Sequence, residues 1–116
     1  MARVRVMYWK EIPVQVQAED DSGQVSKPLD ARFQQGVDTV SMIDGSGGSD
    51  AYLEAWDWGG YSAVAGDADA AAARVAEGYN KEFPMDFVAR IIQLQKSGAR
   101  DTRPGAIDYW RDDDAD

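Results

Sequence analysis

Acidic side chains are the most numerous groups in this sequence that could take part in chemistry. The 116 residues include 21 Asp and Glu against 12 Lys and Arg, a net charge of −9, and neither His nor Cys. The sequence therefore lacks a thiolate nucleophile, a zinc thiolate site and a histidine general base. Acid/base catalysis would rest on carboxylates, Lys and Tyr. The candidates show no spacing that selects a pair: Lys10, Glu54, Asp57, Tyr61 and Lys81. We favour a non-catalytic protein and assign no catalytic residue.

The segment 44–50 alternates acidic and hydroxyl side chains, as a calcium-binding loop does. The bidentate Glu that such a loop needs at its twelfth position is replaced by Ala55. The segment is also rich in Gly, but it lacks the Gly-Lys-Ser/Thr ending of a phosphate-binding loop. We predict a flexible loop here, with no metal and no cofactor.

The C-terminal end is strongly acidic and follows two large aromatic side chains. Residues 112–116 contain four Asp and follow Tyr109 and Trp110. Such a run can bind Mg²⁺ or Ca²⁺ weakly, but we favour a solvated tail over residues 99–116. Tyr109 and Trp110 either dock on the body of the protein or anchor a partner, and docking is the favoured interpretation.

Aromatic and cationic side chains near the N-terminus form the main candidate interaction site. Tyr8, Trp9, Lys10 and Pro13 surround a short link, where we expect Trp9 to be exposed. They form the candidate contact edge for a protein partner.

Trp56 and Trp58 are a second pair of candidate interaction residues. They share one face of a predicted strand, where an open aromatic face would stack a planar ligand or a partner's side chain. The alternative is that they lie in the core beneath the helices, which we favour for Trp56.

Charge and hydropathy limit the classes of partner. A strongly acidic protein lacks the Lys and Arg that neutralise phosphates, so nucleic acid and anionic membranes are disfavoured. No apolar run approaches the roughly 20 residues of a membrane span. We expect a cytoplasmic protein with a protein partner.

The elements that position these groups begin with two alternating segments, residues 3–9 and 13–19, which predict an antiparallel hairpin. A turn signal leads to a third short strand over 24–27. Residues 52–64 alternate again but are interrupted by Gly59 and Gly60. These glycines either bend one strand or form the turn of a hairpin, and we favour the hairpin.

Helices are predicted over 31–42, over 67–83 and from Pro84 to residue 97. Gly36 lies inside the first helix, which indicates either a close approach to another element or simple tolerance. Together, these segments predict an α+β fold: a small antiparallel sheet with two or three helices packed on one face. Residues 1–98 would form this single domain.

The run from Val6 to Val16, which reads Val-Met-Tyr-Trp-Lys-Glu-Ile-Pro-Val-Gln-Val, resembles the bacterial small-domain family labelled virulence factor. The resemblance continues through Arg32-Phe33-Gln34-Gln35 and Ala51-Tyr52-Leu53, covering roughly the first 60 residues. The same domain also occurs joined to HEAT-type helical repeats.

The resemblance implies a small intracellular α+β domain that serves as an accessory or scaffold unit. The resemblance also implies a genomic setting beside genes for folate- and corrinoid-linked one-carbon metabolism. The resemblance therefore implies an alternative function, an accessory subunit or ligand-binding partner in one-carbon methyl transfer. Homodimerisation through an uncovered strand edge is left open by the sequence.

Overall fold

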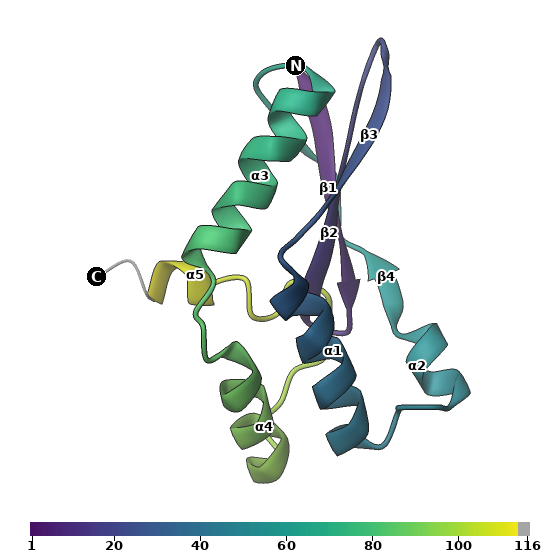
Figure 1. Ribbon diagram of the computed structural model, residues 1–116, viewed down its shortest axis with the longest axis vertical. Helices are drawn as coiled ribbons and strands as arrows, with labels where there is room; N and C mark the ends of the chain where they lie inside the picture. The colour runs from purple at the N-terminus through teal and green to yellow at the C-terminus, as the bar shows by residue number, and fades with distance from the viewer. Residues whose placement is uncertain (114–116) are drawn as a thin grey trace.

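A meander of three antiparallel strands forms the centre of the computed structural model, which describes residues 1–113 (Figure 1). The strands are β1 (Ala2–Trp9), β2 (Ile12–Asp20) and β3 (Gly23–Pro28). In β1 the buried residues Val4, Val6 and Tyr8 alternate with Arg3 and Arg5. This period of two is the reason the segment forms a strand with one covered face. The three predicted N-terminal strands are confirmed.

The free edge of β1 pairs with two short strands, β4 (Trp56–Trp58) and β5 (Ser62–Val64). Both are antiparallel to β1: Trp58 pairs with Met7, and Ser62 pairs with Val4. The chain therefore continues along one edge across Gly59, whose N–H donates to the Val6 carbonyl at 2.8 Å. The predicted hairpin is wrong, because β4 and β5 each pair with β1. In place of the single bent strand that was the alternative, two short strands lie on either side of the glycines.

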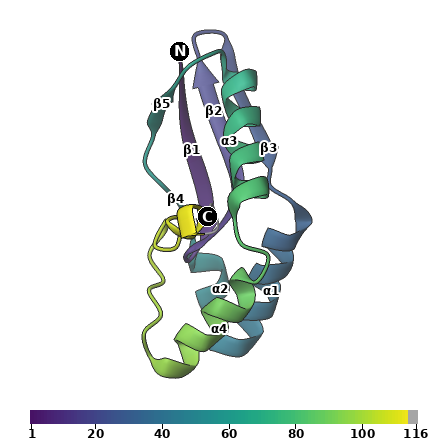
Figure 2. The same ribbon diagram turned by 90° about the vertical axis from the view of Figure 1, so that its left-hand side faces the viewer.

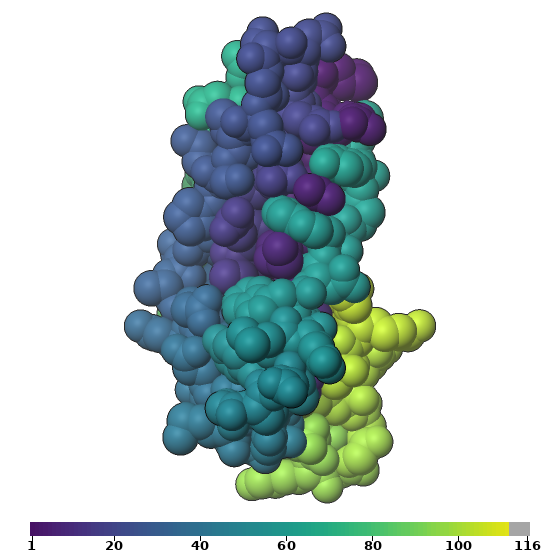
Figure 3. Space-filling view, turned by 90° about the vertical axis from the view of Figure 1, so that its right-hand side faces the viewer, coloured from purple at the N-terminus to yellow at the C-terminus, as the bar shows by residue number. Residues whose placement is uncertain are grey.

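A short helix replaces the beginning of the predicted strand. Residues Asp50–Glu54 form α2, which lies over one end of the sheet on the side away from α3 (Figures 1 and 3). Its Tyr52 packs against Trp9, with ring centroids 5.6 Å apart. The remainder of that sheet face stays open above α2, as Figure 3 shows.

The longer helices are α1 (Ala31–Asp44), α3 (Ala68–Glu82) and α4 (Phe87–Ser97), and the short α5 (Trp110–Asp113) follows. Figure 2 shows α3 running along the strands, with α1 and α4 side by side below it. The α+β class with an antiparallel sheet is confirmed. No helix in the described part of the chain is long and apolar enough to cross a membrane.

Three phenylalanines fill the junction between the helices. The Phe33 ring lies 5.4 Å from that of Phe83 and 5.3 Å from that of Phe87. Gly36 faces the same junction: a Cβ atom there would lie 2.7 Å from Cζ of Phe87. The close approach that Gly36 indicated is therefore present, and it explains why the helix contains a residue of low helical propensity.

Much of the segment expected to be a tail packs on the body of the protein. Ile107 and Trp110 are buried, while Tyr109 is 60% exposed. The Trp110 ring lies 6.4 Å from that of Phe83, so the favoured docking of this aromatic pair holds for Trp110. The remaining tail residues, 114–116, lie outside the described part of the chain.

Candidate functional site

The residues of the motif Tyr8-Trp9-Lys10-Glu11-Ile12-Pro13 point in different directions from the turn between β1 and β2. Trp9 is fully buried and its indole N–H donates to the Tyr52 carbonyl at 2.9 Å. The expected exposure of Trp9 is wrong, because α2 covers it. Tyr8 and Pro13 are buried as well, so three of the four residues of the expected contact edge are enclosed within the domain.

The two charged residues of the motif belong to an ion-pair network. Lys10 has a positive φ of 51° and donates from Nζ to Oδ2 of Asp44 at 2.7 Å. Glu11 is fully buried and accepts two hydrogen bonds from Arg100, at 2.7 and 2.8 Å. Arg100 also donates to Asp44 at 2.9 Å. The network joins the β1–β2 turn to the end of α1 and to the segment after α4.

Asp44 begins the loop that resembled a calcium site, and its carboxylate is fully engaged within the protein. Oδ2 accepts from Lys10 and Arg100, and Oδ1 accepts from the backbone N–H of Ser46 at 3.0 Å. Burial alone would raise the pKa of Asp44, but the hydrogen bonds from Lys10, Ser46 and Arg100 lower it well below its ordinary value. Asp44 therefore acts as a structural anion.

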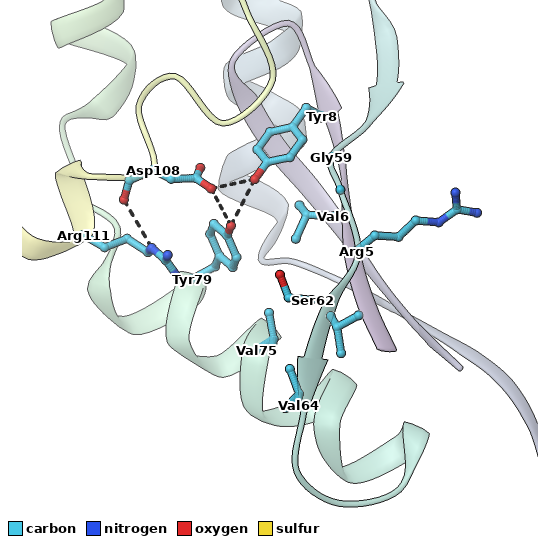
Figure 4. Close-up of a pocket in the computed structure, with 12 residues that line it drawn as sticks. Arg5, Val6, Tyr8, Gly59, Ser62, Val64, Val75, Tyr79, Asp108 and Arg111 are labelled. Atoms are coloured by element: carbon cyan, nitrogen blue, oxygen red, sulfur yellow. Dashed lines mark hydrogen bonds between the residues drawn. The ribbon is translucent and has the colours of Figure 1, made fainter. Parts of the chain in front are cut away.

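A second polar cluster, on the covered face, joins Tyr8 to residues far along the chain (Figure 4). Oδ2 of Asp108 accepts hydrogen bonds from Tyr8 at 2.6 Å and from Tyr79 at 2.8 Å. The two hydroxyl oxygens lie 3.2 Å apart. Burial raises the pKa of all three groups, and the Asp108 carboxylate adds to the shift at both phenols. Nothing in the sequence marks Tyr79 and Asp108 as site residues, because only their approach to Tyr8 distinguishes them.

The open face of the sheet carries a cluster of arginines and aromatic rings, of which Arg3 and Tyr61 are exposed and Arg5 and Trp58 are half-buried. The guanidinium of Arg5 lies 3.9 Å from the Trp58 ring centroid and 4.8 Å from that of Tyr61. Arg3 lies 4.7 Å from the Tyr61 centroid. We call Arg3, Arg5, Trp58 and Tyr61 the open-face cluster. Of the predicted tryptophans, only Trp58 belongs to it.

Trp56 has a different environment from Trp58. Its ring meets that of Tyr52 edge-on at 6.2 Å, and Tyr52 in turn covers Trp9. Trp56 is half-buried in this aromatic stack rather than lying beneath the large helices. The structure therefore places Trp56 and Trp58 in separate surroundings. Tyr109 and Trp110 lie on the C-terminal segment, apart from both.

Neighbouring polar side chains hold the arginines of the open-face cluster. Arg5 donates from Nε to Oε1 of Gln17 at 2.8 Å, and Arg3 forms an ion pair with Glu19. A guanidinium fixed over an aromatic ring keeps outward N–H donors in a defined plane, a geometry suited to carboxylates. The open-face cluster is thus a preorganised cationic and aromatic surface on an acidic protein.

Comparison with known proteins gives a family. The family model described as Virulence factor matches residues 7–92, which extends the resemblance beyond the first 60 residues to the middle of α4. No curated protein and no solved structure matches significantly. Since the match covers well over half of the sequence and includes the Tyr8–Pro13 motif, the chain belongs to the virulence factor family.

Proposed function

We propose that this domain is a non-catalytic interaction module that binds an acidic segment of a protein partner through the open-face cluster. The observation that carries the proposal is Arg5, whose guanidinium lies against the Trp58 and Tyr61 rings on the part of the sheet face that α2 leaves open. Trp, Tyr and Arg are the side chains enriched at the energetic centres of protein interfaces.

Charge supports an acidic partner segment. The protein has an excess of nine negative charges, yet Arg3 and Arg5 project from the same strand face with Glu19 as a counter-ion to Arg3. A carboxylate of a partner would replace solvent at the outward N–H groups of Arg5, and the neighbouring rings would contribute apolar contact area. A polyphosphate chain carries a charge on every unit and needs more neutralising cations than the two arginines of this face supply, so the net negative charge opposes it more strongly than a short acidic segment. We propose that this contact is made in the cytoplasm.

Affinity capture with matched variants tests this function. The tagged protein is exposed to a lysate of the organism that encodes it, at low and at moderate salt, beside Arg5→Ala, Trp58→Ala and the control Tyr109→Ala. We expect one partner whose recovery falls at least tenfold with both open-face variants and not with the control. Moderate salt should weaken the same partner, because screening reduces a charged contact.

A partner retained equally by all the variants would contradict the open-face assignment. Recovery of a second copy of this chain, sensitive to Trp58→Ala, would instead identify a homodimer and contradict a heterologous partner. Far-UV circular dichroism of each variant establishes that the sheet is intact before binding is compared.

The alternative, a ligand-binding partner in folate or corrinoid methyl transfer, remains a separate proposal. A pterin stacking on Trp58 would have to displace Arg5, whose guanidinium already lies 3.9 Å from that ring centroid. Titration with folates, read by Trp fluorescence in the wild type and in Trp58→Phe, tests it. An unchanged wild-type signal would remove this small-molecule function.

A further inference from the structure

A cavity of about 330 Å³ lies between α3 and β5, on the side of β1 opposite the open face of the sheet (Figure 4). Its walls are apolar side chains of Val6, Val64 and Val75. Gly60 and Ser62, both exposed, lie at its solvent side. A pocket of this volume is at the lower end of the range for small-molecule sites, about 300 to 1,000 Å³.

The polar end of the cavity is the cluster of Tyr8, Tyr79 and Asp108. Each phenol donates its proton to Oδ2 of Asp108, so the phenol oxygens retain lone pairs that can accept a hydrogen bond. Oδ1 of Asp108 is buried and has no hydrogen-bond partner among the described residues. Tyr8, Tyr79 and Asp108 therefore offer acceptor atoms at this end, because both phenol protons are already donated to Asp108.

Two arginines line the cavity without pairing with this carboxylate. Arg111 donates from Nε to the backbone carbonyl of Asp108 at 3.3 Å, and its guanidinium lies 4.3 Å from the Tyr79 ring centroid. Figure 4 shows the side chain of Arg5 directed away from the cavity. The carboxyl thus lies in a partly desolvated position with a raised pKa, which indicates that an added positive charge would stabilise its ionised form.

We propose that this cavity binds a small organic ammonium ion with a short apolar body. The ammonium group lies at the Asp108 end, where the carboxylate supplies charge and the phenol oxygens of Tyr8 and Tyr79 accept hydrogen bonds. The apolar body lies along the three valines. Arg5 is directed away from the cavity and the Arg111 guanidinium lies against the Tyr79 ring, so an anionic ligand at the Asp108 end would face the carboxylate and the two phenol oxygens. This arrangement favours cations at that end.

The binding test uses three probes of the same length: butylammonium, butan-1-ol and butyrate. Isothermal titration calorimetry on the intact protein at pH 7 measures affinity, and amide chemical shifts locate the site. We expect butylammonium to bind at least tenfold more tightly than either other probe, with shifts at Gly60, Ser62 and Val75. Equal binding of the alcohol, or tighter binding of butyrate, would overturn the proposed ligand class.

Two variants test whether Asp108 recognises the charge. Asp108→Asn should weaken butylammonium binding at least tenfold, whereas Asp57→Asn, an equal change of charge at an exposed position, should leave the affinity within twofold. Val75→Phe, which places a larger side chain in the apolar part of the cavity, should abolish binding independently. Unchanged affinity in Asp108→Asn or in Val75→Phe would overturn the site.

The pH dependence provides a further readout. The titratable and charged groups that face Asp108 are Tyr8 from β1, Tyr79 from α3 and Arg111 from α5. Since the raised pKa values of Tyr8 and Tyr79 keep both phenols protonated, affinity should rise with pH as Asp108 ionises. An affinity independent of pH between 4 and 7 would contradict the role of Asp108.

Discussion

Arg100 and Glu11 are 89 positions apart in the sequence and form a bidentate ion pair inside the domain, with N–O distances of 2.7 and 2.8 Å. The side chains are 4% and 0% exposed. A buried pair of this kind fixes geometry strongly, because separating its members leaves a charge without solvent or partner. It anchors the segment after α4 against the β1–β2 turn.

Replacing Arg100 by Ala should destabilise the domain by about 3 to 5 kcal/mol, because Glu11 would remain buried without its counter-ion. Urea unfolding followed by Trp fluorescence measures the change. The matched control is Arg103→Ala, which breaks the ion pair with Asp101 at 2.6 Å at an exposed site. The control should change the free energy of unfolding by less than about 1 kcal/mol. Equal losses in both variants would refute the structural role of the buried pair.

Gly36→Ala should destabilise the domain by about 1 to 3 kcal/mol, because the new Cβ would overlap the Phe87 ring. Gly78→Ala is the control: it lies in α3, and its Cβ would meet only the end of the Glu82 side chain, at 3.2 Å. There the higher helical propensity of Ala should stabilise the protein by up to about 1 kcal/mol. Thermal unfolding measures both changes: the melting temperature should fall for Gly36→Ala and rise for Gly78→Ala. A stabilised Gly36→Ala would disprove the close contact between α1 and α4.

Asp44 should make stability fall at acid pH. Its pKa in the folded protein is lowered from 3.8, so the folded state binds fewer protons than the unfolded state below that value. The stabilisation is complete above pH 3.8 and is lost as pH falls through the lowered pKa. Asp44→Asn should cost about 3 kcal/mol at neutral pH and make the acid limb shallower. Urea midpoints between pH 2 and 7 test this, with exposed Asp21→Asn as control. An acid limb as steep as that of the wild type would contradict it.

Asp108 should affect the pH dependence of stability in the direction opposite to Asp44. Burial raises its pKa from 3.8, so the folded state binds more protons than the unfolded state just above that value. Its contribution is complete below pH 3.8 and is lost as pH rises through the raised pKa. Asp108→Asn keeps an acceptor for Tyr8 and Tyr79 and should remove this decline. Urea midpoints at closely spaced pH values above 4 measure it, and parallel curves for variant and wild type would argue against the raised pKa.

Local pattern was sufficient for most of the fold. The alternation of Val4, Val6 and Tyr8 with Arg3 and Arg5 identified β1 and its two faces, since the side-chain period of a strand is fixed by its backbone. Helical spacing identified α1, α3 and α4 in the same way. The antiparallel α+β class followed from these elements, and the motif around Trp9 identified the family.

Tertiary structure alone decided what the side chains of the motif do. Trp9 was expected to be exposed because its neighbours are charged turn residues, but α2 covers it, and that helix forms where the alternation had predicted strand. The chain also passes Gly59 without turning back, because β1 offers one continuous edge to both β4 and β5.

The partners of Tyr8, Lys10 and Glu11 lie 34 to 100 positions away along the chain. Spacing within a segment carries information only about neighbours on the same helix or strand. The sequence by itself therefore determined the net charge, most of the helices and strands, and the family. Which carboxylates became buried, which aromatic rings remained open to a partner, and where the cavity formed depended on packing between distant segments.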